Sequence, residues 1–363
     1  MTGTSLDGVD VAFIHYHEEN GQWKYSVVKA ETIPYPPNWK TRIENLVLQN
    51  AVTYLKTDAH FGYYLGNLAK AWMEENNFYH EIDFIASHGQ TIFHQPENHM
   101  TSQIGHGAAV CSASNQPVIC DFRTQDVANG GQGAPIVPIG DKILYADFEF
   151  CLNLGGIANI SAKISHEKIV AFDICGCNSL LNFLAHGLRM EFDRDGEIAA
   201  RGFINEALLE ELNSNWYFKK EYPKSIGGGF ISKVMIPVLR NHHLSYEDKM
   251  RTACEHIAQR ISADIKMIAE REMIELSSGM QMLITGGGAF NKFLVETISH
   301  HAPVSVVIPD PVTVKFKEAI VIGLIACLRL RNEVNVLSSV TGALQDTCSG
   351  TIHQNKNKPL VIS

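Results

Sequence analysis

The chain has 363 residues, of which 45% are hydrophobic and 19% charged, an ordinary globular composition at a length that favours two domains. Its net charge of −9 and isoelectric point near 6, without a Lys/Arg run, argue against a nucleic-acid surface. No apolar run approaches the ~18 residues that a membrane span needs, and the N-terminus enters a Gly/Asp turn rather than a signal peptide. We therefore expect a soluble, cytoplasmic protein without a nucleic-acid or membrane partner.

The first ten residues, MTGTSLDGVD, gather glycines, hydroxyls and carboxylates ahead of an alternating apolar run, VDVAFIHY, that predicts a strand. Glycines let backbone N–H groups approach an anion, hydroxyls add donors, and an aspartate beside a phosphate commonly holds Mg²⁺. The same pattern also suits a hairpin turn. A phosphate loop and a plain turn both remain open on these residues alone.

The segments that follow predict an α/β pattern. One or two strands are expected in WKYSVVKAETIPY, and helical spacing covers residues 40–48 and 60–76. A short buried strand, IDFIA, then leads into SHGQT. Ligands of α/β sheets lie at the carboxyl ends of strands, so His88 and Gln90 are well placed for a polar substrate. A hydrogen-bonded turn histidine without a ligand fits His88 equally.

A second polar loop follows the predicted strand PVICDF. This loop contains Arg123 and a Gly-rich turn over residues 130–133. So many polar groups and glycines are costly to order without a purpose. We interpret the loop as facing the substrate and as part of the crossing to a second domain.

The second half of the chain repeats the opening pattern. FCLNLGGIANISAK predicts a hairpin about a Gly-Gly turn, and the next strand is expected to end at Asp173, before a tight turn through Gly176 and a helix from Asn178. Apolar strands are expected in MQMLIT, ahead of a Gly-Gly-Gly turn, and in VSVVI. Further helices are expected over residues 206–212, 246–263, 264–276 and 316–331.

Three strand-to-glycine turns and two β-rich openings followed by helices predict a duplicated α/β domain. Such a pair would close on a nucleotide, with backbone N–H groups and helix N-termini facing its phosphates. No GxxxxGK[ST] phosphate loop occurs in the sequence.

The eight cysteines are scattered, and none forms a CxxC pair. Several fall in apolar runs predicted to be strands, so we expect reduced thiols rather than disulfides. Cys175 and Cys177 form a CxC pair, but no second Cys/His pair follows at zinc spacing, which argues against a metal site.

Ordered motifs run nearly from end to end of the chain. They are GTSLDGVD (Gly3–Asp10), SHGQT (Ser87–Thr91), DFR (Asp121–Arg123), GGQGAP (Gly130–Pro135), NLGGIANIS (Asn153–Ser161), FDxxxxN (Phe172–Asn178), DRDG (Asp193–Gly196), PKS (Pro223–Ser225), TGGGAFN (Thr285–Asn291), KEA (Lys317–Ala319) and VTGA (Val340–Ala343). With these motifs the chain resembles the anhydro-N-acetylmuramic acid kinases of the actin-like/hexokinase ATPase superfamily.

The resemblance implies an α/β fold of two actin-like (ribonuclease H-like) domains. Each is expected to hold a mixed five-stranded sheet flanked by helices, with the nucleotide in the interdomain cleft. We expect the N-terminal domain at residues 1–130 plus 316–363 and the C-terminal domain at 131–315. ATP and Mg²⁺ are implied as cofactors, and a homodimer as the assembly.

The implied activity is ATP-dependent opening of the 1,6-anhydro ring of anhydro-N-acetylmuramic acid with phosphorylation of O6, a step in peptidoglycan recycling that yields N-acetylmuramate 6-phosphate. A carboxylate base activates a water at the anomeric carbon while O6 departs onto the γ-phosphate. Asp173 matches the position of the base, and an aspartate capping the next helix is the alternative. Glu318 resembles a substrate-side glutamate, although first-turn helix acids are common.

The resemblance also assigns binding residues. ATP and its phosphates are assigned to Gly3, Thr4, Ser5, Leu6, Asp7, Gly8, Val9, Asp10, Gly155, Gly156, Gly286, Gly287 and Gly288, with Asp7 as a ligand of Mg²⁺. The sugar is assigned to His88, Gln90, Arg123, Gln132, Gly133, Asn178 and Glu318.

Two motifs depart from the family pattern. FDTGPGN reads FDICGCN here, which keeps Asp173 and Asn178 but loses a hydroxyl donor, and PKSTGRE reads PKSIGGGF, without its Arg and Glu. These changes point to altered affinity for phosphate or substrate with catalysis retained. A kinase for a different amino sugar, a sugar sensor without turnover and a chaperone-like ATPase are the alternatives.

The opening turn also lacks a preceding strand. In the family a strand leads into this turn, whereas here only Met1 and Thr2 do. Its absence leaves N–H and C=O groups unpaired beside the nucleotide. Either the true start lies upstream or the first sheet is one strand short.

Overall fold

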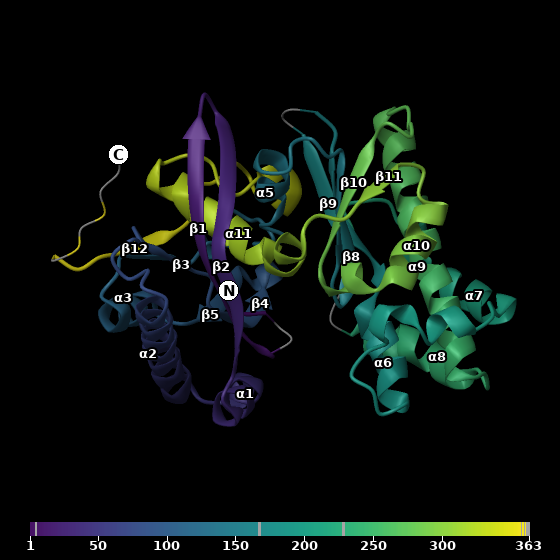
Figure 1. Ribbon diagram of the computed structural model, residues 1–363, viewed down its shortest axis with the longest axis horizontal. Coiled ribbons are helices and arrows are strands. Elements are labelled where there is room, and N and C mark those ends of the chain that lie inside the picture. Colours follow the sequence, from purple (N-terminus) through teal and green to yellow (C-terminus); the bar gives the residue numbers. More distant parts are fainter. Residues whose placement is uncertain (4–5, 166–167, 227–228, 357, 359, 361–363) are drawn as a thin grey trace. The chain divides into compact units, whose positions relative to one another are not determined.

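The computed structural model describes residues 1–3, 6–165, 168–226, 229–356, 358 and 360, and it divides the chain into two compact units. Unit 1 comprises Met1–Leu144 and Glu318–Ser363, and unit 2 comprises Tyr145–Lys317. The boundaries fall at 144/145 and 317/318, whereas we expected them at 130/131 and 315/316. Both units combine sheets with flanking helices, so the α/β class is confirmed (Figure 1).

Unit 2 is organised around one mixed five-stranded sheet of order β11-β10-β7-β8-β9. Strands β7, β8 and β9 pair antiparallel with one another in chain order. Strand β10 pairs parallel with β7, and β11 pairs parallel with β10. A mixed five-stranded sheet flanked by helices is what we expected for this domain. The strands are β7 (Phe150–Leu154), β8 (Ile157–Lys163), β9 (Ile169–Gly176), β10 (Gln281–Thr285) and β11 (Ser305–Val307).

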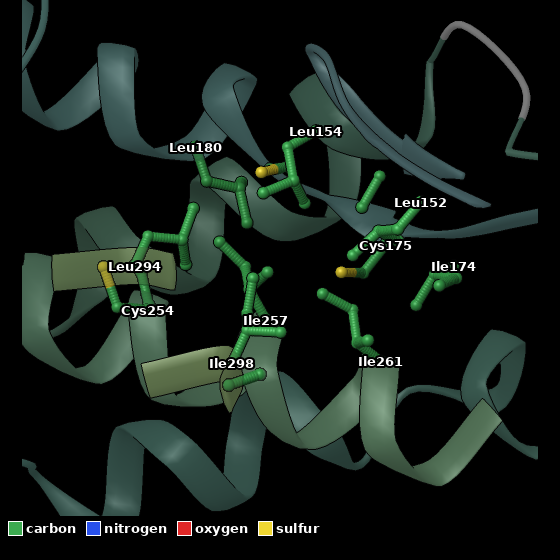
Figure 2. Close-up of a cluster of buried hydrophobic side chains, with 14 of the residues drawn as sticks. Leu152, Leu154, Ile174, Cys175, Leu180, Cys254, Ile257, Ile261, Leu294 and Ile298 are labelled. Carbon is green, nitrogen blue, oxygen red and sulfur yellow. The ribbon is translucent and has the colours of Figure 1, made fainter. Parts of the chain in front are cut away.

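The core of unit 2 lies between this sheet and its longest helix. That helix, α9 (Tyr246–Glu272), packs Cys254, Ile257 and Ile261 toward apolar strand residues such as Leu152 (Figure 2). We expected two helices with a break at residue 263, which is wrong, because nothing between 246 and 272 interrupts the backbone ladder: the segment holds neither Gly nor Pro. The other helices are α6 (Asn178–Gly187), α7 (Glu206–Asn213), α8 (Ile236–Asn241) and α10 (Lys292–His301).

Unit 1 opens with a long antiparallel hairpin, β1 (Gly8–Glu19) and β2 (Gln22–Pro34), so WKYSVVKAETIPY forms a single strand. The remaining strands are β3 (Ile85–Ser87), β4 (Gln90–Gln95), β5 (Met100–Ile104), β6 (Val118–Cys120) and β12 (Thr351–His353). The helices are α1 (Pro37–Glu44), α2 (Ala51–Glu75), α3 (Gly107–Ser114), α4 (Thr124–Ala128), α5 (Pro138–Ile143) and α12 (Ser338–Thr341), and α11 (Pro311–Leu330) crosses from unit 2 into unit 1.

The strands of unit 1 do not form the expected five-stranded sheet. They lie in a two-stranded sheet β1-β2, a three-stranded sheet β12-β6-β3 and the hairpin β4-β5. A cavity separates the facing edges of β1 and β3, so the ladder that would join the first two sheets is interrupted. The expectation of a continuous sheet therefore applies to unit 2 and needs correction in unit 1.

Several element ends also differ from expectation. Helix α1 ends at Glu44 rather than at residue 48, and α2 begins at Ala51 rather than at residue 60. Strand β9 continues through Asp173 to Gly176, because residues 175 and 176 still pair with β8. Helix α11 begins at Pro311 rather than at residue 316, and Phe316 interrupts it with non-helical backbone angles. Glu318 therefore lies just after this interruption.

Candidate active site

Asp173 lies on β9 with a half-buried carboxylate that is held by two donors. Its Oδ2 accepts hydrogen bonds from the Ser225 hydroxyl and the Ile226 amide, each at 3.0 Å. Burial raises the pKa of Asp173, and the two donors partly oppose this effect. Oδ1 accepts no hydrogen bond from the described residues. A fixed carboxylate with one unused oxygen and a raised pKa suits a general base.

The alternative role for Asp173, capping helix α6, is not observed. The residue at the N-cap of α6 is Cys177, and no side chain caps this end. The backbone carbonyl of Asp173 instead accepts a hydrogen bond from the Tyr217 hydroxyl at 2.6 Å. Asp173 is thus tied to the segment that follows α7 rather than to the helix beside it.

The segment that supplies Ser225 is anchored by a buried ion pair. Lys224 Nζ lies 2.8 Å from Oδ1 of Asp264 on α9, and the two side chains are 1% and 9% exposed. Burial raises the pKa of Asp264, whereas the charge and hydrogen bond of Lys224 lower it. Residues 227 and 228 of PKSIGGGF lie outside the described residues.

A row of polar residues crosses the sheet of unit 2 and ends at Asp173. Asn159 on β8 pairs with Asp173, Asn153 on β7 pairs with Asn159, and Thr285 on β10 pairs with Asn153. Directly paired residues place their side chains on the same face of a sheet. The row therefore joins Asp173 to the end of β10, where the Gly286–Gly288 turn begins.

Two glycine turns and Asn178 lie together at one end of this sheet. The backbone N–H of Asn178 donates a hydrogen bond to the Gly155 carbonyl oxygen at 3.1 Å. Its side-chain Nδ2 donates to the Leu154 carbonyl oxygen at 2.9 Å. A Cβ on Gly288 would lie 3.1 Å from Oδ1 of Asn178. The structure therefore brings together five glycines of this unit that we assigned to ATP and its phosphates, and it places the sugar candidate Asn178 beside them. The glycines are Gly155, Gly156, Gly286, Gly287 and Gly288.

The departures in FDICGCN fall inside the core of unit 2. Ile174, Cys175 and Cys177 are fully buried, so these side chains fill the space beneath the turn. Burial raises the pKa of Cys177 to about 12 and also raises the pKa of Cys175 well above its ordinary value, which keeps both as neutral thiols. No group of three or more His, Cys, Asp or Glu placed to hold a metal occurs in the part of the chain that the structure describes.

In unit 1, His88 and Arg123 form a directly bonded pair. Arg123 Nε donates to Nε2 of His88 at 2.9 Å, and Nδ1 of His88 lies 2.8 Å from the Gly89 carbonyl oxygen. Nε2 must accept and Nδ1 must donate, so the imidazole is neutral. Burial, and then the charge of Arg123, lower the pKa of His88 to about 3. His88 is therefore a hydrogen-bonded turn histidine, and Arg123 joins it to the loop that we interpreted as facing the substrate.

Arg123 also fixes the glycine loop. Its Nη1 donates to the Gly133 carbonyl at 2.6 Å, and the Gly133 amide donates to the buried Asp126 at 2.7 Å. The other oxygen of Asp126 accepts from the Thr341 hydroxyl at 2.7 Å. Gln132 stays exposed at the tip of this loop. Arg123 has a pKa lowered to about 10 by burial, which the Glu318 charge opposes.

Other sugar candidates of unit 1 differ in accessibility. Gln90 is buried and accepts a long hydrogen bond of 3.4 Å from Tyr35, whereas Glu318 is exposed. Because the Glu318 carboxylate acts electrostatically on both Arg123 and the Met1 amine, it lies near both groups.

The N-terminal turn is described at Gly3 and over residues 6–10, while Thr4 and Ser5 lie outside the described residues. Leu6 has a positive φ of 54°, Asp7 is exposed, and a Cβ on Gly8 would lie 2.4 Å from a β2 carbonyl oxygen. Val9 is buried, and Asp10 accepts a hydrogen bond from Thr32. Asp7 is the accessible carboxylate of the turn, whereas Asp10 is engaged by the hairpin.

The turn is connected to the sugar candidates through Thr2. The Thr2 hydroxyl donates to the Gly89 carbonyl at 2.6 Å, the same oxygen that receives Nδ1 of His88. Unit 1 thus collects the N-terminal turn, the His88–Arg123 pair, the Gly133 loop and Glu318. Unit 2 separately collects Asp173, Asn178 and the two glycine turns.

Several polar groups of these sites were not predicted from the sequence. Asn153 and Asn159 carried a usable signal, because asparagine is disfavoured in strands and here occupies facing positions of a predicted hairpin. Ser225 lies in the PKS motif, but nothing in that motif indicated its bond to Asp173, 52 residues away. Asp126 carried no such signal, since its partner Thr341 is 215 residues away.

Comparison with known proteins is consistent with this geometry. A family model described as "Anhydro-N-acetylmuramic acid kinase" matches residues 1–355. Proteins of that name from Francisella tularensis subsp. novicida (strain U112) and Bacillus cereus (strain B4264) are 32% and 30% identical over 97% of this chain and 97% and 95% of their own lengths. The chain belongs to the anhydro-N-acetylmuramic acid kinase family. A solved activator of 2-hydroxyisocaproyl-CoA dehydratase from Clostridium difficile aligns with 48% of this family member and 59% of its own chain, at 16% identity and a TM-score of 0.29.

Two further observations concern the chain as a whole. None of the helices in the described ranges combines the length and apolar character needed to cross a membrane. All eight cysteines carry free thiols, as expected.

Proposed function

We propose that this protein is an ATP-dependent phosphotransferase that opens 1,6-anhydro-N-acetylmuramic acid and phosphorylates its O6. Membership of the anhydro-N-acetylmuramic acid kinase family supports the kinase activity and its place in peptidoglycan sugar recycling. The observation that carries the mechanism is the carboxylate of Asp173, whose Oδ2 is fixed by two donors while Oδ1 accepts no hydrogen bond from the residues that the structure describes. The competing sugar sensor would have no need of such a base.

In this mechanism Asp173 takes a proton from the water that attacks C1 of the sugar. The C1–O6 bond breaks as the C1–O(water) bond forms, and O6 takes the γ-phosphoryl group of ATP, so ADP leaves. The raised pKa of Asp173 brings its basicity closer to neutral pH. Ser225 and Ile226 keep Oδ2 occupied and thereby direct Oδ1 toward the water.

Nucleotide binding is proposed for the glycine turns of each unit. In unit 2 a Cβ at Gly286 would lie 2.4 Å from Asn153, and one at Gly156 would lie 2.8 Å from Ser179, so only glycine fits at these two positions. Mg²⁺ that travels with ATP keeps several waters and needs few carboxylates. Exposed Asp7 fits as such a ligand, and the bound ion would neutralise charge on the phosphates.

Sugar binding is proposed for His88, Gln90, Arg123, Gln132, Gly133 and Glu318 in unit 1 and for Asn178 in unit 2. Among the described residues, Arg123 donates one N–H to His88 and one to the Gly133 carbonyl. The remaining N–H donors of the Arg123 guanidinium suit the carboxylate of the muramic acid lactyl group. Because His88 is neutral, it can accept a hydrogen bond from the Arg123 guanidinium without offering a second positive charge to that carboxylate.

A product assay in ¹⁸O-water tests this function. The chain, ATP, Mg²⁺ and the anhydro sugar should give N-acetylmuramate 6-phosphate with one ¹⁸O at C1, as read by mass spectrometry. Product from ordinary N-acetylmuramate at an equal rate, without ¹⁸O at C1, would exclude ring opening. Turnover with another anhydro amino sugar alone would instead favour a related kinase.

Asp173→Asn tests the base separately. Loss of a general base lowers kcat by about 10²–10⁴-fold, while nucleotide affinity should stay within a few-fold. Retained turnover in this variant would remove Asp173 from the mechanism. Cytoplasmic location and a homodimer are proposed with the family, and light scattering of the purified chain tests the latter.

A further inference from the structure

The VTGA motif (Val340–Ala343) has no role in the function proposed above, yet it contacts the glycine loop of unit 1. The motif covers the end of α12 and the two residues that follow this helix. The Thr341 carbonyl accepts a hydrogen bond from the Gln132 amide at 2.8 Å. The Leu344 amide donates to the Asn129 carbonyl at 3.0 Å. Two backbone bonds thus join the motif to the loop without the Thr341 side chain.

The hydroxyl of Thr341 bonds to a buried carboxylate of that loop. It donates to Oδ1 of Asp126 at 2.7 Å, and the Leu337 carbonyl lies farther from it, at 3.3 Å. The Gly133 amide donates to Oδ2 of Asp126, also at 2.7 Å. Asp126 is fully buried, and Thr341 is 1% exposed. Each oxygen of this carboxylate is therefore held by a neutral donor.

Asp126 lies beside the guanidinium of Arg123. Both side chains bond to Gly133, since Arg123 Nη1 donates to its carbonyl at 2.6 Å and Asp126 accepts from its amide. The two residues are also three positions apart at the start of α4, a spacing that makes helical side chains neighbours. The charge of Asp126 acts on Arg123, after the larger effect of Glu318. Asp126 is thus placed to compete with a substrate for the guanidinium.

The observed hydrogen bonds keep these two opposite charges apart. In the described part of the chain, the guanidinium donates to His88 and Gly133 and not to Asp126. Asp126 accepts instead from Gly133 and Thr341. A buried carboxylate oxygen that loses its donor is unfavourable until it gains another. For Oδ1 of Asp126, the charged donor Arg123 is the strongest replacement for the Thr341 hydroxyl.

We propose that Thr341 is a specificity-determining residue, because its hydroxyl holds Asp126 away from Arg123 and keeps the guanidinium available for an anionic substrate. The inference rests on the proposed function, in which Arg123 binds the carboxylate of the muramic acid lactyl group. Thr341 is a positioning residue that acts through Asp126. An ion pair between Arg123 and Asp126 would weaken binding of a sugar that carries a carboxylate and leave binding of a neutral sugar unchanged.

The test compares two sugars that differ in one group. The first is 1,6-anhydro-N-acetylmuramic acid, and the second is 1,6-anhydro-N-acetylglucosamine, which has the same bicyclic ring without the carboxylate. Thr341→Val replaces the hydroxyl by a methyl group and keeps the backbone bond to Gln132. Its dissociation constant for the anionic sugar should rise by about tenfold, and that for the neutral sugar should stay within about twofold of the parent value. Titration calorimetry measures both constants, and an unchanged preference for the anionic sugar would overturn the proposal.

Two control variants separate the hydroxyl from general effects of substitution. Thr341→Ser keeps the hydroxyl and should restore the parent affinity for the anionic sugar. Thr347→Val is the matched control, because Thr347 is also buried and its hydroxyl lies 2.9 Å from that of Ser349 rather than from a carboxylate. This control should leave the preference between the two sugars unchanged. Thr341→Ala takes the place of Thr341→Val if the latter does not fold.

A double variant distinguishes competition between charges from a loss of structure. Asp126→Asn removes the competing charge and keeps an oxygen for the Gly133 amide. Thr341→Val/Asp126→Asn should therefore bind the anionic sugar more tightly than Thr341→Val does, although it lacks one more native group. Weaker binding by the double variant than by Thr341→Val would show that the hydroxyl only supports the loop, and would overturn the proposal.

Modification of arginine by phenylglyoxal gives a readout that needs no sugar. Pairing with Asp126 should slow the modification of Arg123 several-fold in Thr341→Val and not in Thr341→Ser, while exposed Arg201 should react at the parent rate in both. Equal rates at Arg123 in the two variants would overturn the proposal. A parent chain that binds neither sugar would count against the proposed function alone, because the rates at Arg123 still show whether Thr341 keeps the charges apart.

Discussion

Lys224 and Asp264 form an ion pair of 2.8 Å in the interior of unit 2, one residue away from the hydroxyl that holds Asp173. The Lys224 ammonium also lies 5.2 Å from the centre of the Phe172 ring, beside Asp173 in the chain. The pair therefore fixes both sides of the candidate base. Its role is to position Ser225, since neither charged group is assigned to the substrate.

Lys224→Met should destabilise the protein by about 3–5 kcal/mol, because it leaves the Asp264 carboxylate buried without its partner. Urea unfolding measures the change. The double variant Lys224→Met/Asp264→Leu removes both charges and should recover most of the loss. A single variant within about 1 kcal/mol of the parent chain would show that the pair is not the anchor of this segment.

Ser225→Ala should move the acidic limb of the kcat–pH profile to higher pH. Its hydroxyl donates to Oδ2 of Asp173 and lowers the pKa of that carboxylate, so its removal raises the pKa. A base is active when deprotonated, and activity is then lost at a higher pH as the solution is acidified. Ser214→Ala, at an exposed serine of unit 2, is the control and should leave the profile unchanged. An unshifted limb in Ser225→Ala would exclude Asp173 as the titrating base.

Local sequence patterns predicted most elements and the strand-to-glycine turns. The β7-β8 hairpin, the strand ending near Asp173 and the helix from Asn178 depend on periodicity and on glycine positions, which act over a few residues. The resemblance then indicated the fold class and named Asp173. These features were predictable because they are local or are carried by an ordered series of motifs.

The supports of the site were not predictable in this way. Asp126 meets Thr341 across 215 residues of chain, and Lys224 meets Asp264 across 40. No periodicity or spacing encodes such pairs, since they depend on how distant elements pack. For the sheet of unit 1, the sequence raised the alternative of one strand too few, but it did not indicate that the gap lies between β1 and β3 and is lined by α2 and α11.

His88 should make the protein less stable as the pH falls below the pKa that this side chain has in the unfolded chain. Its pKa is about 6.5 when unfolded and about 3 when folded, so the unfolded chain binds the extra proton between these values. The free energy of unfolding should fall by up to ~1.4 kcal/mol per pH unit from this group in that window and be unaffected above it.

His88→Gln isolates this contribution, because glutamine keeps one donor and one acceptor for Gly89 and Arg123 but does not titrate. The stability difference between the parent chain and the variant, from urea unfolding at pH 7.5, 6.5 and 5.5, should shift in favour of the variant as pH falls. A constant difference for His88→Gln would show that this imidazole is not held neutral.

Gly286→Ala should lower stability and weaken ATP binding together. Gly286 has a φ of +83°, and an added Cβ would lie 2.4 Å from Asn153 Oδ1 and 2.9 Å from the carbonyl carbon of Leu154. The backbone strain alone costs about 1–3 kcal/mol, and relief of the contact must displace the turn from β7.

Gly279→Ala is the matched control in the same unit. Its nearest neighbour to an added Cβ would be Ser277 Oγ at 3.6 Å, an ordinary contact, so its stability should stay within about 0.5 kcal/mol of the parent chain. Urea unfolding and titration with ATP measure both variants, and Gly286→Ala should raise the dissociation constant by about tenfold, equivalent to about 1.4 kcal/mol. If Gly286→Ala unfolds earlier but binds ATP as tightly as Gly279→Ala, the turn contributes to the fold of unit 2 and not to the nucleotide site.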